Sequence, residues 1–191
     1  MAEQSVGEID GVVLPAPGVW EIDPNHTTAE FVARHVLTKV RGRFTKLSGA
    51  IHVAEKPEDS TVEVEIEASS IETHTEDRDN HLRSPDFLDV ERFPKLTFKS
   101  TALRPAGENT FQLDGEMTIR DVTLPVTLDV EFIGVHDSPW GTKLATFSAR
   151  TDIDRHDFGM TWNMAIETGG WLVGRNVQIE LEIEAVYKEE A

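Results

Sequence analysis

The sequence has no cysteine, a single tyrosine and few basic residues for its length. The missing cysteine excludes disulfides, thiolate metal ligands and a cysteine nucleophile. Its 18 lysine and arginine residues stand against 35 acidic ones, so the formal net charge is 18 − 35 = −17. A chain with this charge repels phosphate backbones, and we expect no nucleic-acid partner.

Long hydrophobic runs are also missing. The longest apolar run near the N-terminus, Val12 to Leu14, is far shorter than the core of a signal peptide. No stretch approaches the roughly 18 apolar residues of a membrane-spanning helix. We therefore expect a cytoplasmic protein without stable membrane insertion.

The remaining composition is that of one globular domain. Hydrophobic residues make up 39% of the 191 residues, which is enough for a single packed interior. The first 17 residues have no periodic pattern and predict a flexible N-terminal tail. Residues 18–188 then form the folded domain.

Alternation with period two is the strongest pattern in this domain. In residues 62–68, apolar residues alternate with three glutamates, which is typical of a half-buried strand. The same pattern predicts further strands at residues 19–22, 31–36, 44–53, 96–103, 111–119, 122–132, 144–153 and 177–185. Turn-forming residues separate these segments, so neighbours in sequence pair as antiparallel strands.

One helix interrupts the strands. Thr73 and Glu76 have the spacing of a capping box, and Pro85 ends the helical stretch after Arg83. The segment that follows, residues 85–94, is irregular but carries three large apolar side chains. We interpret it as a plug or lid over an opening.

Long antiparallel strands can form a sandwich or a closed barrel, and composition alone does not decide between them. Two features favour a barrel: one main helix that would cover an end, and small residues beside large ones on the inward face, as in Ala145, Phe147 and Ala149. An eight-stranded barrel can hold one small ligand.

Motifs for catalysis and metal binding are missing. The chain has no HExxH, GxSxG, P-loop or GxGxxG pattern. Residues 152–157 resemble the start of a calcium loop, but Asp157 stands where glycine is required, so we interpret them as a charged turn with Asp–Arg contacts. We expect no catalytic residues, no metal and no enzyme activity.

Two features point to polar contacts of a ligand. His35 shares the alternation of Phe31 and Ala33, so its imidazole is either a satisfied core group or a hydrogen-bond partner for a ligand head group. Residues 34–46 contain five basic residues and no acid. These either pair with glutamates on neighbouring strands or, through Arg34, Arg41 or Arg43, bind a polar or anionic head group.

Seven segments together resemble the YceI-like family of lipid-binding proteins. They are Trp20–His26, Phe31–His35, Arg41–Phe44, Arg78–Phe87, Phe93–Ser100, Gly115–Thr123 and Asp154–Gly159. The resemblance implies an all-β fold, an extended antiparallel eight-stranded lipocalin-like β-barrel, whose cavity holds a polyisoprenoid chain. It also implies frequent homodimers and gives no catalytic residues.

We predict from these observations a protein that binds, sequesters or transports a long-chain isoprenoid lipid, such as a polyisoprenoid or an isoprenoid quinone. No cofactor besides this lipid is expected. The predicted ligand-binding residues are Phe31, His35, Phe44, Phe87, Leu88, Phe93, Phe98, Phe111, Met117, Leu128, Phe147 and Trp162, with Arg34, Arg41 and Arg43 as head-group candidates. The alternatives are a stress-protective structural protein with a filled core, and an enzyme acting on a hydrophobic substrate.

Overall fold

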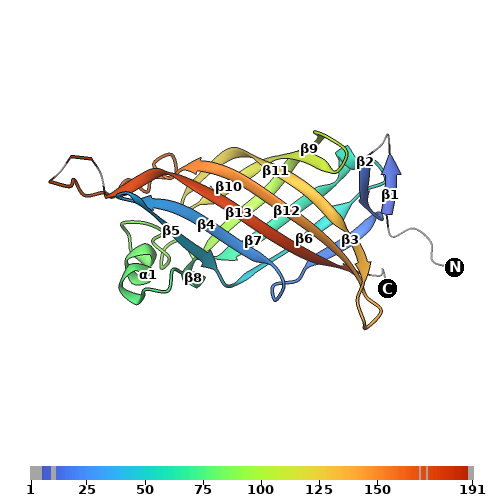
Figure 1. The fold of residues 1–191 in the computed structure, drawn as a ribbon, viewed down its shortest axis with the longest axis horizontal. Helices are drawn as coiled ribbons and strands as arrows, with labels where there is room; N and C mark the ends of the chain where they lie inside the picture. Colours follow the sequence, from blue (N-terminus) through green and yellow to red (C-terminus); the bar gives the residue numbers. More distant parts are fainter. Residues whose placement is uncertain (1–5, 10–11, 168, 171, 189–191) are drawn as a thin grey trace.

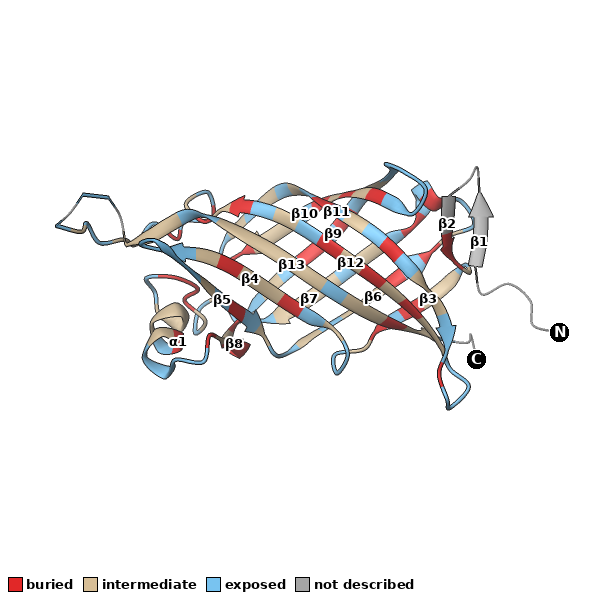
Figure 2. Cartoon of the chain, in the orientation of Figure 1, coloured by how far each residue is buried: buried red, intermediate tan, exposed pale blue. Residues whose placement is uncertain are grey.

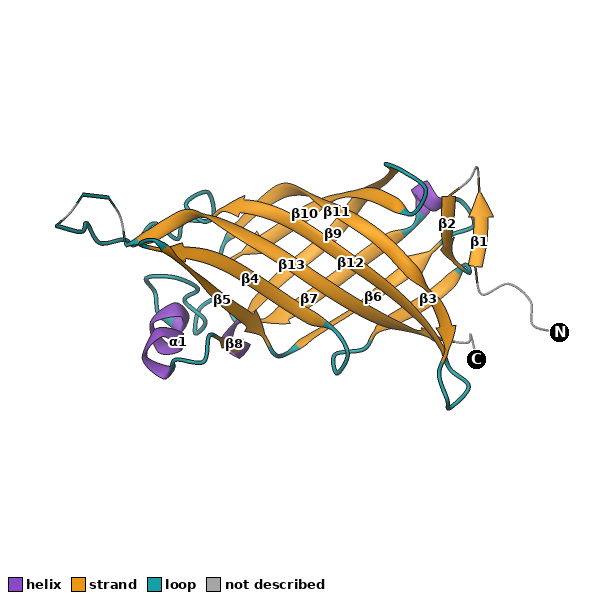
Figure 3. Ribbon diagram, in the orientation of Figure 1, coloured by secondary structure: helices purple, strands orange, loops and turns teal. Residues whose placement is uncertain are grey.

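The computed structural model describes residues 6–9, 12–167, 169–170 and 172–188. Strands dominate these residues, and the one α-helix lies at one end of the molecule (Figure 3). The strands of the main sheet are β3 (Gly18–Ile22), β4 (Thr28–His35), β5 (Thr38–Phe44), β6 (Leu47–Val53), β7 (Thr61–Glu67), β8 (Ile71–Glu72), β9 (Lys95–Pro105), β10 (Thr110–Ile119), β11 (Val122–Asp137), β12 (Lys143–Asp154) and β13 (Val173–Lys188). The other elements are the strands β1 (Val6–Ile9) and β2 (Val12–Pro15), the 3₁₀ turns η1 (Pro57–Asp59) and η2 (Ala68–Ser70), and α1 (Glu76–Arg83).

The sheet closes on itself as the predicted eight-stranded antiparallel barrel. Its strands follow one another in the order β12, β11, β10, β9, β7, β6, β3 and β13, and the pairing of β13 with β12 completes the ring (Figure 1). The fold class expected from the sequence is therefore confirmed.

Strand β13 has two partners on its other side. Its C-terminal part, Ala185–Lys188, pairs with β3, whereas the part from Val173 to Glu182 pairs with β4. Strands β5 and β8 continue the sheet beyond β4. The ring of eight strands is thus extended at one end by a second group of strands.

Alternating burial follows the strands as the sequence pattern requires (Figure 2). In β12, Ala145, Phe147 and Ala149 are buried, and Arg150 beside them is exposed. In β7, glutamates face lysines of β9 on the outside, with Lys95–Glu65 at 2.6 Å and Lys99–Glu63 at 3.0 Å. The charged rows therefore lie on the outer face of the barrel.

One predicted strand differs from the structure, and one observed strand was not predicted. The predicted strand 44–53 is interrupted at Thr45 and Lys46, and its first residue ends β5. The polar and basic run from residue 38 to residue 43 concealed the alternation of β5, which the sequence pattern did not predict. The irregular break arises because Thr45 N–H and Oγ1 both donate to the carbonyl of Ser70, outside the strand ladder.

The predicted capping box is wrong. Helix α1 begins at Glu76 with Thr75 at the N-cap, and no side chain caps it. Thr73 is buried instead, where its backbone N–H and Oγ1 both donate to the carboxylate of Asp79. A buried carboxylate needs these donors, so Thr73 satisfies Asp79 rather than the end of the helix.

Each end of the barrel carries a separate cover. At one end, β1 and β2 pair only with each other among the described strands, and Leu14 and Pro15 are buried against the barrel. This hairpin lies within residues 1–17, where the sequence predicted a flexible tail. At the other end lie α1 and the segment 85–94 that the sequence predicted as a lid (Figure 1).

Candidate functional site

A cavity of about 260 Å³ occupies the inside of the barrel. A single water needs roughly 10–15 Å³ by the same measure, so the space suits a chain of many atoms. Its wall is almost entirely aliphatic and aromatic. The polar residues at its wall are Thr27, Glu30, Ser60, Thr97 and Arg155.

The cavity is long. Its lining residues on β13 extend from Val173 to Ile183, which are 183 − 173 = 10 residues apart. Ten strand residues span roughly 33 Å, and a strand tilt of about 40° reduces this to roughly 25 Å along the barrel axis. Such a tube fits an extended chain better than a compact ring system.

Glycines help to keep the middle of the barrel open. Gly42 lies directly across from Phe31, and a Cβ at Gly42 would be 2.3 Å from the ring. A Cβ at Gly115 would likewise be 2.4 Å from the ring of Phe98. Both rings therefore lie against the barrel wall, in space that the side chain of any residue other than glycine at position 42 or 115 would occupy.

Nine of the twelve predicted ligand-binding residues line this cavity. They are Phe31, Phe44, Phe87, Leu88, Phe98, Phe111, Met117, Leu128 and Phe147. Phe87 and Leu88 enter from the predicted lid segment, which is held to α1 by the bond from Leu88 N–H to the carbonyl of Leu82. Strand alternation and the apolar lid signal were sufficient to find these positions.

Three predicted residues lie elsewhere. His35 is exposed at the end of β4, just beyond Ala33, the last cavity-lining residue of that strand. Phe93 is half-buried, with the guanidinium of Arg92 4.9 Å from its ring. Trp162 packs behind the lid, 5.5 Å from the ring of Phe87 and 4.5 Å from that of His81.

The predicted head-group arginines are all on the outer surface. Arg41 pairs with Glu180 at 2.9 Å, and Arg43 pairs with Glu72 at 2.9 Å. Arg34 is exposed. For Arg41 and Arg43, the alternative interpretation as partners of glutamates on neighbouring strands is confirmed.

The cation at the cavity wall is Arg155, which the sequence analysis missed. Its side chain is 3% exposed. Its guanidinium donates to the carbonyls of Met160, Trp162, Val173 and Gly174, and burial lowers its pKa from the ordinary value. Among the described residues no carboxylate forms an ion pair with it. The inward alternation through Ile153 extends to this position and was the signal that could have found it.

Residues 152–157 form the predicted charged turn only in part, because 152–154 end strand β12 and 155–157 make the turn; the expected Asp–Arg contact is present. Asp154 pairs with Arg175 at 2.6 Å and accepts a hydrogen bond from the backbone N–H of His156. Asp152 accepts a bond from Asn176 at 3.0 Å. These contacts tie the end of β12 to β13 and hold the loop that Arg155 supports.

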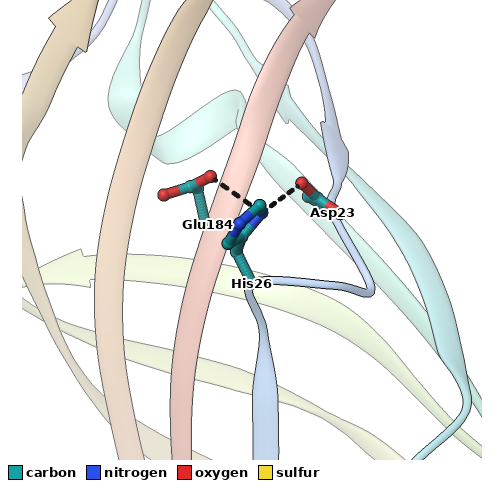
Figure 4. A group of neighbouring side chains, drawn as sticks. All are labelled: Asp23, His26 and Glu184. Carbon is teal, nitrogen blue, oxygen red and sulfur yellow. Dashed lines mark hydrogen bonds and ion pairs between the residues drawn. The ribbon is translucent and has the colours of Figure 1, made fainter. Parts of the chain in front are cut away.

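One group of three possible metal ligands exists among the described residues: Asp23, His26 and Glu184 (Figure 4). His26 Nδ1 is 2.7 Å from Asp23 Oδ2 and 3.5 Å from Glu184 Oε1. Ligand atoms around a tetrahedral zinc would be roughly 3.3 Å apart, given bonds of about 2.0 Å. The short Asp23–His26 contact is therefore that of a hydrogen-bonded ion pair.

The ion pair shifts the pKa values of both Asp23 and His26. The hydrogen bond with Asp23 raises the pKa of His26 above its usual value, and Glu184 adds to this effect. The hydrogen bond with His26 lowers the pKa of Asp23, helped by the backbone N–H of Asn25. The pair lies outside the barrel, in the connection between β3 and β4, so it stabilises the wall and does not face the cavity.

The family model of the YceI-like domain matches residues 20–185. The chain belongs to the YceI-like family. Relatives include a UPF0312 protein of Pseudomonas fluorescens, 32% identical over 92% of this chain and 89% of that protein. Another is UPF0312 protein PC1_2518 of Pectobacterium carotovorum, 36% identical over 81% of each chain.

Solved structures share the YceI-like fold. BcnA of Burkholderia cenocepacia superposes with a TM-score of 0.74 at 23% identity, covering 86% of this chain and 99% of that one. The YceI protein of Campylobacter jejuni gives 0.69 at 27% identity, covering 82% and 90%. A polyisoprenoid-binding domain of Saccharophagus degradans gives 0.66 at 14% identity, covering 88% and 98%.

Replacing Arg155 with methionine is expected to destabilise the protein by about 3 kcal/mol or more, because several buried carbonyls lose their donors. Arg155→Lys keeps the charge but loses the planar guanidinium with its several donors, so its stability should lie between that of Arg155→Met and that of the wild type. Urea unfolding measures the difference. The exposed Arg150→Met is the control and should change stability by less than about 0.5 kcal/mol. Equal effects at both positions would contradict the role assigned to Arg155.

The Asp23–His26 pair predicts a pH-dependent stability difference between wild type and His26→Gln. The raised pKa of His26 stabilises the fold below the unfolded value of about 6.5, and this gain disappears as pH rises through the folded value. The lowered pKa of Asp23 stabilises the fold above about 3.9, and this gain disappears as pH falls through the folded value.

The difference in midpoint between the two proteins should therefore be greatest between about pH 4 and pH 6.5. Thermal melts across the pH range measure it. His74→Gln is a matched control, since His74 is exposed and its contact with Glu72 is longer, at 3.5 Å. A difference that does not vary with pH would refute the assignment.

Proposed function

We propose that this protein binds the apolar chain of an isoprenoid-type lipid inside its barrel and carries or sequesters it. The observation that supports the proposal is the long cavity of about 260 Å³ with an almost entirely apolar wall. The structural neighbour from Saccharophagus degradans, a polyisoprenoid-binding domain, adds support through its shared fold.

The affinity of such a site follows from the size of the chain. A tail of about 20 carbons at roughly 0.3 kcal/mol per heavy atom gives a net binding free energy near 6 kcal/mol. This value corresponds to a dissociation constant of tens of micromolar, and closer packing would lower it. The protein would thus hold its lipid reversibly, as transport requires.

Arg155 is the residue that we propose meets the polar end of the lipid, in place of Arg34, Arg41 and Arg43. It lines the cavity, and its charge has no carboxylate partner among the described residues. Four of its five N–H donors are used by backbone carbonyls, which leaves one on Nη2. A polar or anionic head group at the Arg155 end of the cavity would face the positive charge of this buried guanidinium, which is little screened by solvent.

Binding is better supported than catalysis. An enzyme using the cavity would need an inward base or acid with a perturbed pKa. The one acid along the described cavity wall, Glu30, lies 3.7 Å from Arg41 of the outer surface, and no histidine of the described chain lines the cavity. An arginine is too basic to serve as a general base. The open middle of the barrel also argues against a structural protein with a filled core.

Two further features stay predictions from the sequence. These are a homodimer, which the resemblance to the family implies, and a cytoplasmic location. The described residues include no helix long and apolar enough to cross a bilayer.

Filling the cavity tests the proposal. Ala149 lines the cavity and is 6% exposed, so Ala149→Trp places an indole in the space that the lipid would occupy. We expect the purified wild type to yield an apolar lipid on organic extraction and mass spectrometry, and the variant to yield at least about tenfold less, as expected for a loss of at least 1.4 kcal/mol. An added prenyl alcohol or isoprenoid quinone should raise the melting midpoint of the wild type only.

Arg150→Trp is the matched control, because its side chain leaves the same strand on the outer face. It should bind like the wild type, and circular dichroism should show both variants folded. Failure to recover any apolar ligand from several expression hosts, together with an unchanged midpoint on adding prenyl compounds, would refute lipid binding.

A further inference from the structure

The connection between β4 and β5 consists of two exposed apolar residues in an unfavourable conformation. Val36 and Leu37 form this turn, with exposures of 36% and 85%. Val36 has φ of 54°, a region that β-branched residues avoid and that glycine or asparagine occupy easily. A two-residue hairpin turn normally carries polar residues and glycine. The sequence at this turn therefore favours neither stability nor solubility.

A third exposed apolar residue, Met164, is joined to this turn through backbone hydrogen bonds. Val36 N–H donates to the carbonyl of Leu172 at 2.8 Å, and Leu172 N–H donates to the carbonyl of Met164 at 2.9 Å. Met164 is 56% exposed. We call the group of Val36, Leu37 and Met164 the apolar tip. Three exposed apolar side chains thus gather at one end of an otherwise acidic molecule.

Two unpaired cations lie directly behind the apolar tip. Arg34 of β4 and Lys39 of β5 are opposite each other in the strand pair, where like charges repel. The other basic residues of the segment, Arg41, Arg43 and Lys46, each pair with a glutamate. No ion pair of the described residues includes Arg34 or Lys39, and Arg34 reaches only the carbonyl of Leu37 at 3.4 Å. This repulsion would be relieved by an anionic surface.

The apolar tip lies where the cavity ends. Ala33 and Val173 line the cavity, and they immediately precede Arg34 and follow Leu172. The start of β13, the β4–β5 turn and α1 lie at the same end of the barrel (Figure 1). A surface that bound the tip would therefore lie next to this end of the cavity.

We propose that the apolar tip docks, end-on and reversibly, onto a bilayer that contains anionic lipids. Val36, Leu37 and Met164 would enter the boundary between head groups and acyl chains, and Arg34 and Lys39 would meet lipid phosphates. This inference rests on the proposed function, because docking would bring the cavity to the source or destination of its lipid.

The net charge of −17 is compatible with end-on docking. Interactions between exposed charges fade beyond a Debye length of about 8 Å at physiological salt. The glutamate rows of β7 lie along the barrel wall, whereas Arg34 and Lys39 are next to the tip. Glu167 is an exposed acid in the neighbouring loop, and it keeps the attraction weak.

Sedimentation with vesicles tests the docking of the untagged full chain. We expect the wild type to bind vesicles of phosphatidylcholine mixed with phosphatidylglycerol more than vesicles of phosphatidylcholine alone. Val36→Gly combined with Leu37→Asn places glycine where φ is positive and a polar turn residue beside it, so it should keep or raise the melting midpoint. The same variant should lower the bound fraction on the order of tenfold, as expected when about 1.4 kcal/mol of apolar burial is lost.

Matched variants locate the contact. Trp140→Ser removes an 87% exposed apolar residue from the β11–β12 connection at the opposite end of the barrel (Figure 1) and should leave binding unchanged. Arg34→Gln with Lys39→Gln should abolish the preference for phosphatidylglycerol. Lys56→Gln with Arg150→Gln removes two other exposed cations without ion pairs in the described chain and should preserve the preference.

The outcomes separate docking from cargo binding. Docking is overturned if the wild type sediments with neither vesicle, or if the Trp140 variant loses as much binding as the turn variant. It is also overturned if both pairs of charge variants lose the lipid preference equally. Lipid extraction from the same preparations tests the proposed function independently, since a protein that yields lipid but ignores vesicles fails only the docking proposal.

Discussion

The pairing of β12 with β13 is the interaction on which the rest of the structure depends. It joins eleven consecutive positions, from Leu144 to Asp154, and it closes a sheet that would otherwise end in two long open edges. Closure divides every strand into an inner and an outer face. Only then do the alternating glutamates become a solvated surface and the alternating apolar residues the wall of a cavity.

Closure alone does not make a cavity, because an eight-stranded barrel can be filled by its own side chains. Two details of this chain keep the interior open. Small residues such as Ala33 and Ala149 face inward, and the rings of Phe31 and Phe98 lie over Gly42 and Gly115. The aromatic residues therefore form the surface of the space and do not cross it. The glycines determine whether the barrel is hollow as much as the large residues do.

Sequence alternation predicted the barrel and most of the cavity wall because side-chain direction in a strand is a local property. It failed where direction depends on distant contacts. His35 continues the inward series of β4, but the cavity ends at Ala33 and leaves the imidazole in solvent. Arg155 was overlooked because a buried arginine is possible only when carbonyls surround it, here those of Trp162 in the following loop and Gly174 in β13.

The difference between local patterns and distant contacts also explains the outcomes for the helix and for the basic segment. Thr73 and Glu76 have suitable spacing for a capping box, yet the buried Asp79 takes the donors of Thr73. In residues 34–46, whether a cation is paired depends on which strand lies beside it, and the sequence cannot supply this information. Arg41 reaches Glu180 of β13, 139 residues away, whereas Arg34 faces Lys39.

Strand β13 follows all the other barrel strands in the chain and joins β12 to both β3 and β4. During synthesis the inward apolar face of the sheet therefore stays exposed to solvent until β13 has left the ribosome. Pairings of such long sequence separation form slowly and leave the nascent sheet exposed to aggregation. The enclosed cavity therefore exists only once β13 has paired with β12 on one side and with β3 and β4 on the other, so the last strand of the barrel to be synthesised creates the site.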